Sequence, residues 1–416
     1  MTNNRSPQLM GWAIWGIAAL FYGYEFIHRI LPAAMIPELK LAFHVSDTAL
    51  GALTAIYFWA YALFQIPAGI LIDRYGSRVL LTTACLIVTI GSFLLAYSPN
   101  INIAFLSRFL VGVGSAFAFV GCLKLGRQWI HPDSFPLVVG FTNLCAQIAA
   151  ILGNQPLATL VDDIGWQWTV IFMSGIGSLI TLALALMIRN KTQHSTTPQL
   201  LSLRDFLAYL KQIIHHKQTW LIAIYGCLLV SPIVAFGEFW GIHYLQQKCH
   251  LSRPDAAFLN SAIFMGIAIG GPLLGWFAKH YHHFLRMMRL CTSVALICLL
   301  MIVFCDQLSY SVVMGLLVVY GMMSSNMLLC FSMINREYES DHQATAIGFT
   351  NTIVMFGGAF FPVIIGLMLD YLTKLSPNHY LVPQNVEDLE KALVILPMAL
   401  AIALIVTLFI KPKIIK

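Results

Sequence analysis

Residues 69–78 read Gly-Ile-Leu-Ile-Asp-Arg-Tyr-Gly-Ser-Arg, and three of these ten side chains are charged. The charged part separates two long runs, 48–72 and 79–107, that contain no Asp, Glu, Lys or Arg. An α-helix needs ~20 consecutive apolar residues to cross a bilayer. Each run is long enough for a membrane crossing, so the segment indicates a short polar loop between two membrane helices.

The composition extends this interpretation to the whole chain. Of the 416 residues, 59% are hydrophobic and only 10% are charged, whereas a soluble domain carries about 25% charged residues. A chain of this length would need more charge to cover a water-exposed surface. The composition therefore excludes a soluble enzyme, a disordered protein and a nucleic-acid binder, and it indicates a polytopic membrane protein in contact with the lipid bilayer.

Splitting the charge-free runs at turn residues predicts twelve membrane helices and an all-α membrane protein. The predicted boundaries are 10–37, 47–72, 79–97, 101–127, 136–161, 168–189, 219–246, 254–279, 287–305, 308–334, 343–372 and 388–410. The first run follows a short polar start without a small-residue cleavage site. We therefore expect a membrane helix there and not a removed signal peptide.

The distribution of Lys and Arg among the loops predicts the orientation. With the N-terminus inside, 17 basic residues fall in inside segments and 5 in outside loops. Both termini are therefore expected in the cytoplasm of a cell, with the protein as a multi-pass component of the inner membrane. This bias also accounts for the formal net charge of +6 without nucleic acid.

The chain divides into two similar parts. A polar stretch predicts an N-terminal six-helix bundle (1–190), a cytoplasmic linker with an amphipathic helix (191–218) and a C-terminal six-helix bundle (219–416). The tetrapeptide Gly-Phe-Thr-Asn occurs at 140–143 and again at 348–351, an offset of 208. Other pairs at nearly this offset are Asp162 and Asp370, Arg127 and Arg336, and Gly69 and Gly275. Parallel repeats of this kind are typical of transporters, whose substrate site lies between the repeats.

These motifs resemble those of the major facilitator superfamily. Residues 69–78 match its signature for the loop between helices 2 and 3, and Arg108-x-x-x-Gly112-x-Gly114 resembles its helix-4 motif. Residues 165–168, Gly-Trp-Gln-Trp, resemble its turn between helices 5 and 6. The resemblance implies two pseudo-symmetric six-helix bundles and transport by alternating access.

The loop motif predicts a cytoplasmic gate. A carboxylate at Asp73 could face the N-terminus of helix 11, where unpaired N–H groups carry partial positive charge. In the resembling family this contact closes the inner gate. The expected gate residues are Gly69, Asp73, Arg74, Gly76, Arg78 and Arg127. The alternative is a solvated loop that only fixes the topology.

Charged residues inside membrane helices are candidates for function because their burial in hydrocarbon is costly. Arg29 in helix 1 and Glu238 in helix 7 are 209 residues apart, so we expect them to face each other across the pseudo-twofold axis. An Arg binds carboxylate through two parallel hydrogen bonds, and a Glu can accept an ammonium. The expected substrate-binding residues are Arg29, Glu238, Tyr24, Tyr57, Asn143, Gln147 and Asn351. The alternatives are that the two charges pair only with each other, or that Glu238 serves only the proton.

Proton coupling is expected at Glu238 or Glu25. Arg29 lies one helical turn from Glu25 and favours its charged form. Glu238 is therefore the preferred proton carrier.

The sequence favours a secondary active transporter for a small polar organic solute, with an amino acid, short peptide or related zwitterion as the preferred substrate and protons as the coupling ion. Helix 1 is similar to that of the organophosphate:phosphate antiporter group at Tyr22-x-Tyr24 and Arg29, but helix 7 lacks that group's second Arg. Alternatives are a carrier of organic anions, organophosphates or nucleosides, an exporter of drugs or siderophores, and a non-transporting sensor.

No enzyme motif, cofactor or metal site is expected. The nine cysteines are scattered without a Cys-x-x-Cys pair, and buried free cysteines behave as small hydrophobic residues. We expect the protein to function as a monomer.

Overall fold

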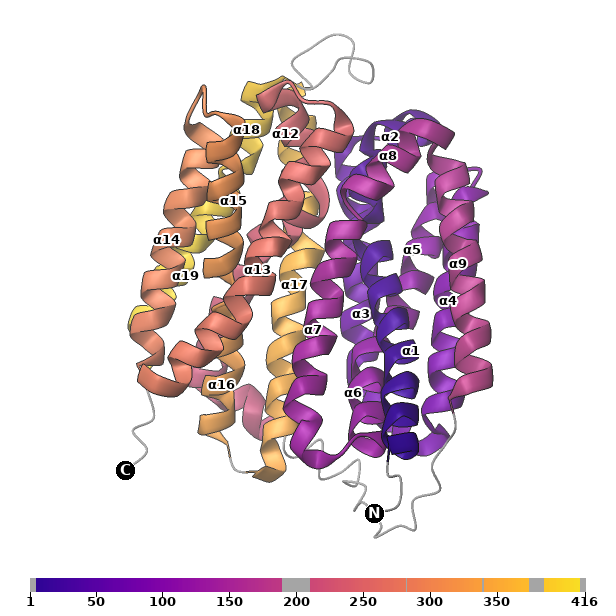
Figure 1. Cartoon of the computed structure of the whole chain (residues 1–416). Helices are drawn as coiled ribbons and strands as arrows, with labels where there is room; N and C mark the ends of the chain where they lie inside the picture. Colours follow the sequence, from indigo (N-terminus) through magenta and orange to yellow (C-terminus); the bar gives the residue numbers. More distant parts are fainter. Residues whose placement is uncertain (1–4, 189–209, 282, 339, 374–384, 412–416) are drawn as a thin grey trace.

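The computed structural model describes residues 5–188, 210–281, 283–338, 340–373 and 385–411. All regular elements within these ranges are helices, and they run mostly parallel to one long axis (Figure 1). We call residues 5–188 the first half and residues 210–411 the second half.

The described helices form twelve spans, six in each half. The first half contains α1 (Arg5–Ile30) with η1 (Leu31–Met35) and α2 (Ile36–Phe43), α3 (Asp47–Tyr75), α4 (Ser77–Ala96), α5 (Ile101–Ser115) with α6 (Ala118–Trp129), α7 (Phe135–Leu152) with α8 (Gln155–Ile164), and α9 (Trp166–Met187). The second half contains α11 (Lys217–Pro232) with η3 (Ile233–Trp240) and α12 (Gly241–Cys249), α13 (Arg253–Tyr281), α14 (Phe284–Phe304), α15 (Tyr310–Ser324) with α16 (Met327–Glu337), α17 (Ser340–Thr373), and α18 (Val386–Leu393) with α19 (Ile395–Phe409).

The predicted all-helical membrane fold is confirmed. Eleven helical segments among the described residues are long and apolar enough to cross a membrane, and the span built on α1 is the twelfth. Six of the predicted helices are interrupted: the first, fourth, fifth, seventh, tenth and twelfth. Of the predicted linker helix, residues 210–215 are helical, and the remainder lies outside the described residues. The three-part domain division stays a prediction.

The two halves repeat local backbone details as well as helix order. His44 ends α2 with φ 51° and His250 ends α12 with φ 52°, and both adopt the left-handed conformation. Two residues later in each half, a serine side chain accepts a hydrogen bond from a backbone N–H group: Ser46 from that of Ala49, and Ser252 from that of Asp255. Both side chains cap the helix that follows. These features recur at an offset of 206 residues and extend the repeat seen in the sequence.

Helix α1 begins and α19 ends at the same end of the molecule (Figure 1). We call this the terminal end, and we call the opposite end, with α2, α8, α12 and α18, the far end. The assignment of the terminal end to the cytoplasm stays a prediction.

At the far end, a carboxylate from one half caps a helix of the other. Asp370, in the last turn of α17, accepts hydrogen bonds from the backbone N–H groups of Asp47 and Thr48, each at 2.9 Å. These N–H groups have no partner within α3 because they belong to its first turn. The negative charge of Asp370 also faces the positive end of the α3 dipole.

The repeat-related Asp162 takes part in a second contact between the halves at this end. Its Oδ1 atom lies 3.3 Å from Nη1 of Arg253, the first residue of α13. Arg253 also pairs with Glu38 of α2. Each half thus contributes a carboxylate near the start of the repeat-related helix of the other half.

Small residues allow α3 and α17 to approach closely at the far end. A Cβ atom added to Gly51 would lie 2.4 Å from the Pro362 carbonyl oxygen. One added to Gly366 would lie 2.4 Å from the Asp47 carbonyl oxygen. Glycine at helix–helix contacts permits this approach in membrane proteins. The far end is therefore closed by both packing and hydrogen bonds.

Replacing Asp370 by Asn should weaken this closure. A carboxylate at a partly buried helix N-terminus contributes up to ~2 kcal/mol, and the amide loses the charge while keeping the shape. Hydrogen–deuterium exchange should become faster in peptides covering residues 44–50. Asp163→Asn is the control, since Asp163 is an exposed carboxylate at the same end. Equal exchange in both variants would contradict the assigned role.

Candidate functional site

Arg29 lies beside an interruption of helix 1, where a side chain from another helix bonds to two backbone carbonyls. Pro32 has no N–H group, so the carbonyl of His28 four residues earlier loses its usual helical partner. Arg108 of α5 replaces this partner: its Nη1 donates to the His28 carbonyl at 2.7 Å and its Nη2 to the Arg29 carbonyl at 3.3 Å. The break shows as the 3-10 segment η1 directly after α1. Arg108 therefore holds the turn that carries Arg29.

Glu238 lies within a second irregular segment. Residues 233–240 form a π-helix, η3, directly after Pro232. π-helical segments are rare and often occur at functional sites. The side chain of Asn260 in α13 donates to the Gly237 carbonyl at 2.7 Å and to Oδ1 of Asn154 at 2.8 Å. Asn260 thereby fixes the backbone beside Glu238 and links it to the α7–α8 break of the first half.

Arg29 and Glu238 form an ion pair between the halves. Nε of Arg29 lies 2.6 Å from Oε2 of Glu238, and Nη2 lies 2.8 Å from Oε1. The exposed fractions are 10% for the Arg29 side chain and 3% for that of Glu238. Two parallel charge-assisted hydrogen bonds are the strongest arrangement for an Arg and a carboxylate. The pair predicted from the repeat offset is therefore in direct contact in this structure.

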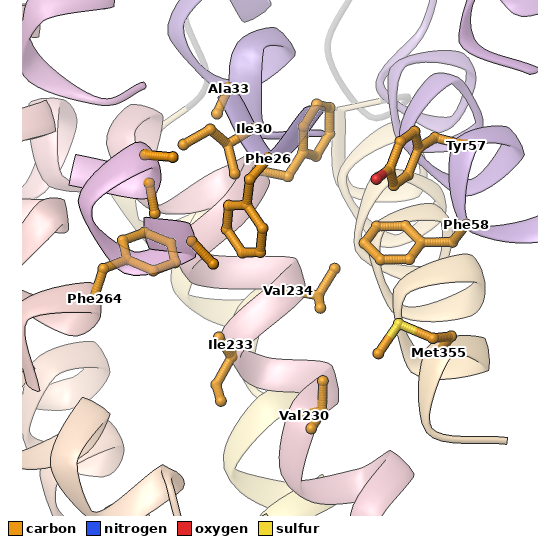
Figure 2. Close-up of a cluster of buried hydrophobic side chains, with 14 of the residues drawn as sticks. Phe26, Ile30, Ala33, Tyr57, Phe58, Val230, Ile233, Val234, Phe264 and Met355 are labelled. Carbon is orange, nitrogen blue, oxygen red and sulfur yellow. The ribbon is translucent and has the colours of Figure 1, made fainter. Parts of the chain in front are cut away.

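Aromatic rings enclose the guanidinium of Arg29. Its central carbon lies 5.0 Å from the ring centre of Phe26 and 4.7 Å from that of Phe58, both cation–π distances. Figure 2 shows Phe26 and Phe58 of the first half in the same buried cluster as Val234 of η3 and Met355 of α17. The ion pair therefore has an apolar surrounding built from both halves.

A second polar group lies behind the ion pair within the first half. The hydroxyl of Tyr57 donates to Oε2 of Glu25 at 2.9 Å, and both side chains are buried. The guanidinium of Arg108 covers the Tyr57 ring at 5.0 Å. Glu25 is thus hydrogen-bonded to Tyr57, whereas Arg29, one turn away, bonds to Glu238.

The other predicted binding residues are spread more widely. Tyr24 is buried toward α4 and α9, since a Cβ atom added to Gly177 would lie 2.2 Å from its hydroxyl. Asn143 is exposed, and Gln147 has a buried side-chain oxygen without a partner among the described residues. Asn351 donates to Oε1 of Gln65 at 2.7 Å across the two halves. The structure thus brings Tyr57, but not Tyr24, to the Arg29 region.

The predicted gate residues cluster at the terminal end. Gly76 ends α3 with φ 83°, a conformation that favours glycine. Nε of Arg78 donates to the Ala185 carbonyl at 2.9 Å. Arg74 lies over the Tyr75 ring and Arg127 over the Phe135 ring. Gly69 lies in α3 with open space beside it. The side chain of Asp73 lies outside the described residues.

Three further polar side chains of the spans make contacts within the protein. Lys124 donates from Nζ to the Ile72 carbonyl at 2.9 Å. Trp240 and Tyr244 are both fully buried. Trp240 Nε1 donates to the Pro362 carbonyl at 3.2 Å, and the Tyr244 hydroxyl contacts the Ile302 and Val303 carbonyls.

Phe58 and Asn154 belong to this region but are absent from the predicted set of residues. Phe58 is one of many apolar residues in its helix, so it gives no separate signal. Asn154 is a polar residue in a membrane span directly after Gly153, a combination that indicates a break bonded within the protein.

Twelve helical spans in two repeated halves, with charged side chains paired between the halves near the middle of the bundle, define a multi-pass membrane transporter. The family model described as Major Facilitator Superfamily matches residues 14–362. The chain belongs to this superfamily, as its motifs indicated. Members of the family are transporters and not enzymes, and the bacterial relatives place the protein in the inner membrane.

Among curated proteins, the chain is similar to "Uncharacterized transporter YybO" of Bacillus subtilis (strain 168), with 25% identity over 64% of this chain and 66% of YybO. It is also similar to "Probable galactarate/D-glucarate transporter GudP" of Escherichia coli (strain K12), with 23% identity over 64% of this chain and 66% of GudP. The matched part thus spans about two thirds of these relatives.

Among solved structures, a bacterial homolog of the human lysosomal transporter Spinster, in an inward-facing and unoccupied conformation, matches with a TM-score of 0.80 at 16% identity. This match covers 98% of each chain. A mutant form of the nucleoside transporter NupG matches with a TM-score of 0.75 at 13% identity over 97% of this chain and 100% of NupG. These matches show a shared fold.

The Arg29–Glu238 pair should behave as a buried, coupled unit. Removing one partner of a buried pair leaves an uncompensated charge and costs ~3–5 kcal/mol, whereas replacing both by apolar residues is often neutral. We expect Arg29→Met and Glu238→Met each to lower the thermal unfolding midpoint in detergent strongly. The double variant should unfold at a higher temperature than either single variant. If the fall in the unfolding midpoint of the double variant equals the sum of the two single falls, the two charges are not coupled.

Proposed function

We propose that the protein is a secondary active transporter that takes up a small zwitterionic solute, such as an amino acid or short peptide, together with protons. The observation that carries the proposal is the buried ion pair between Arg29 and Glu238, one charge from each half. The superfamily match supports transport in general.

The ion pair supports a zwitterion because such a solute presents the same two charges. A solute carboxylate could take the place of Glu238 on the Arg29 fork, with the same bidentate geometry. Glu238 would then accept the solute ammonium. Each charge would exchange one partner for another, so no charge is left unpaired in the buried site.

The same pair supports coupling to protons. Arg29 can hold either Glu238 or the solute carboxylate through its fork, but not both. Protonation of Glu238 removes the negative charge that competes for Arg29 and thus favours binding of the solute. Proton and solute would therefore bind together. While Glu238 carries the proton, its carbonyl oxygen would accept a hydrogen bond from the solute ammonium, and the ionic contact to the ammonium would form once the proton leaves. Glu238 is the preferred carrier and Glu25 the second candidate.

Alternating access would then proceed between the two ends. We propose that the closed far end, with Asp370 on α3 and Arg253 between Glu38 and Asp162, belongs to the inward-facing state. We further propose that residues 69–78 close the terminal end in the outward-facing state, with Asp73 as the charged group.

A carrier for organic acids without an amine is the second candidate. It is favoured by the similarity to GudP, whose name gives galactarate and D-glucarate as its solutes. Such a solute needs Arg29 for its carboxylate but makes no use of the negative charge on Glu238. The two candidates therefore differ in whether the amine is required.

Competition against uptake in proteoliposomes separates these candidates. If the substrate is a zwitterion, both esterifying the carboxylate and acetylating the amine should abolish competition. If the substrate is a simple acid, only the ester should fail to compete for uptake, and the acetylated compound should still compete. Strong competition by neutral sugars would refute both.

Arg29→Lys tests whether the planar guanidinium of Arg29, with its two parallel N–H donors, binds the solute. The measured quantity is the affinity for the solute in the same assay. The variant keeps the charge but loses the planar pair of donors. Loss of one charge-assisted hydrogen bond costs ~1.5–3 kcal/mol, about ten- to a hundredfold in affinity. Arg289→Lys is the matched control, because Arg289 bonds to Thr407 within the second half. Unchanged solute affinity in Arg29→Lys would show that Arg29 does not bind the solute.

Glu238→Gln should uncouple transport from protons. The amide cannot release a proton, so uptake driven by a pH gradient should be lost, while exchange of internal for external solute continues. Glu25→Gln leaves the Arg29–Glu238 pair in place and should keep uptake driven by a pH gradient, whereas loss of that uptake in Glu25→Gln alone would favour Glu25 as the carrier. If Glu238→Gln still accumulates solute in response to a pH gradient alone, Glu238 is not the proton carrier.

A further inference from the structure

A cavity of about 490 Å³ lies at the terminal end of the second half, away from the ion pair. Helices α13, α14 and α16 form its walls. Its lining residues are Leu274, Gly275, Ala278, Phe284, Leu328, Leu329, Ser332, Asn335 and Arg336. The lining is mostly apolar, and Arg336 is its charged member. A mainly apolar concave site with a few polar groups is typical of a small-ligand site.

The repeat shows how this region differs between the halves. Helix α6 is buried at residues 121, 122, 125 and 126, and α16 is buried at 329, 330, 333 and 334, an offset of 208. At this offset Lys124 corresponds to Ser332. Lys124 crosses from α6 to α3 and bonds to the Ile72 carbonyl. The shorter Ser332 does not bridge its groove, and it lines the cavity instead.

The charges also differ between the halves. At this end the first half carries a carboxylate, Asp73, and a cation, Arg127. The second half carries two cations there, Lys279 and Arg336. Among the side chains that the structure describes, Arg336 makes no ion pair, and its guanidinium carbon lies 4.1 Å from the Phe284 ring centre. The cavity thus has a positive charge that suits an anion.

The surroundings of the cavity place it at the membrane interface. Trp276, next to Gly275 in α13, is 55% exposed, and the neighbouring Phe277 and the cavity residue Leu328 are 40% and 41% exposed. In a membrane span, exposed apolar residues face lipid, and Trp concentrates at the level of the headgroups. The apolar wall of the cavity therefore adjoins the hydrocarbon, with Arg336 near the headgroups.

We propose that this cavity binds the headgroup of an anionic phospholipid, with the phosphate on Arg336 and the first part of an acyl chain along Leu274 and Leu328. Arg presents two donors that match phosphate oxygens, and basic pockets between membrane helices are known to hold acidic headgroups. A soluble anion would leave the apolar wall uncovered. This site is separate from the proposed substrate site and does not depend on the transported solute.

The test uses the purified full chain in neutral detergent, titrated with phosphatidylglycerol or phosphatidylcholine while thermal unfolding is followed. A lipid that binds the folded state raises the unfolding temperature. We expect phosphatidylglycerol to stabilise the unaltered protein more than phosphatidylcholine does. In Arg336→Gln the apparent affinity for phosphatidylglycerol should fall about ten- to a hundredfold. Arg286→Gln, an exposed cation of α14 outside the cavity lining, should keep it.

A second variant tests the cavity without removing the charge. A Cβ atom on Gly275 meets nothing within 4 Å, so Gly275→Leu should fold and fill the space. It should lose the phosphatidylglycerol effect, whereas Gly315→Leu, another open glycine, should keep it. This pair remains decisive if Arg336→Gln does not fold.

Three results would overturn the proposal. One is an equal effect of phosphatidylcholine on the unaltered protein. Another is an undiminished phosphatidylglycerol effect in Gly275→Leu. The third is equal stabilisation by water-soluble glycerophosphate, which would indicate a site for free anions and not for lipid.

Discussion

The hydrocarbon of a bilayer offers no hydrogen-bond partners, so a backbone group freed by a break in a membrane helix must find one within the protein. The centre of this molecule is built on that constraint. Pro32 leaves the His28 carbonyl without its helical donor, and Arg108 supplies one. Asn260 bonds to the Gly237 carbonyl within the π-helical segment. These two side-chain hydrogen bonds hold the backbone directly beside Arg29 and Glu238. They therefore fix where the charges of the two halves meet.

The polar contacts between the two halves are suited to a change in how the halves are arranged. A charge at the centre of a membrane helix costs ~2.5–3.5 kcal/mol, so neither Arg29 nor Glu238 is stable there alone. Their mutual bonds offset that cost only while the geometry is kept. At the far end, the bonds of Asp370 to the first turn of α3 are similarly specific. Polar contacts of this kind can be exchanged for other partners, whereas a continuous apolar interface would hold the halves in one arrangement.

Charge-poor runs and the internal repeat predict part of this structure from the sequence. The rest depends on tertiary packing. The scarcity of charge over long runs predicts the twelve spans, because burying a charge in hydrocarbon is costly. The offset of 209 predicts that Arg29 and Glu238 face each other, since repeated halves place equivalent residues symmetrically. By contrast, Tyr24 is one turn from His28 and in the same helix as Arg29, yet it faces the interior of the first half. Neither that rotation nor the π-helix around Glu238 follows from local sequence, because both depend on neighbouring helices.

The repeat also has opposite charges at two pairs of equivalent positions. Arg29 corresponds to Glu238, and Asp73 corresponds to Lys279. Like charges at the first pair would repel across the axis, whereas opposite charges attract and leave the buried centre neutral. At the second pair the sequence places a carboxylate in the first half and a cation in the second. A carboxylate there is suited to a helix N-terminus, and a cation is suited to an anion from the membrane. Under the two proposals above, charge reversal gives two similar backbones different partners at the same end of the molecule.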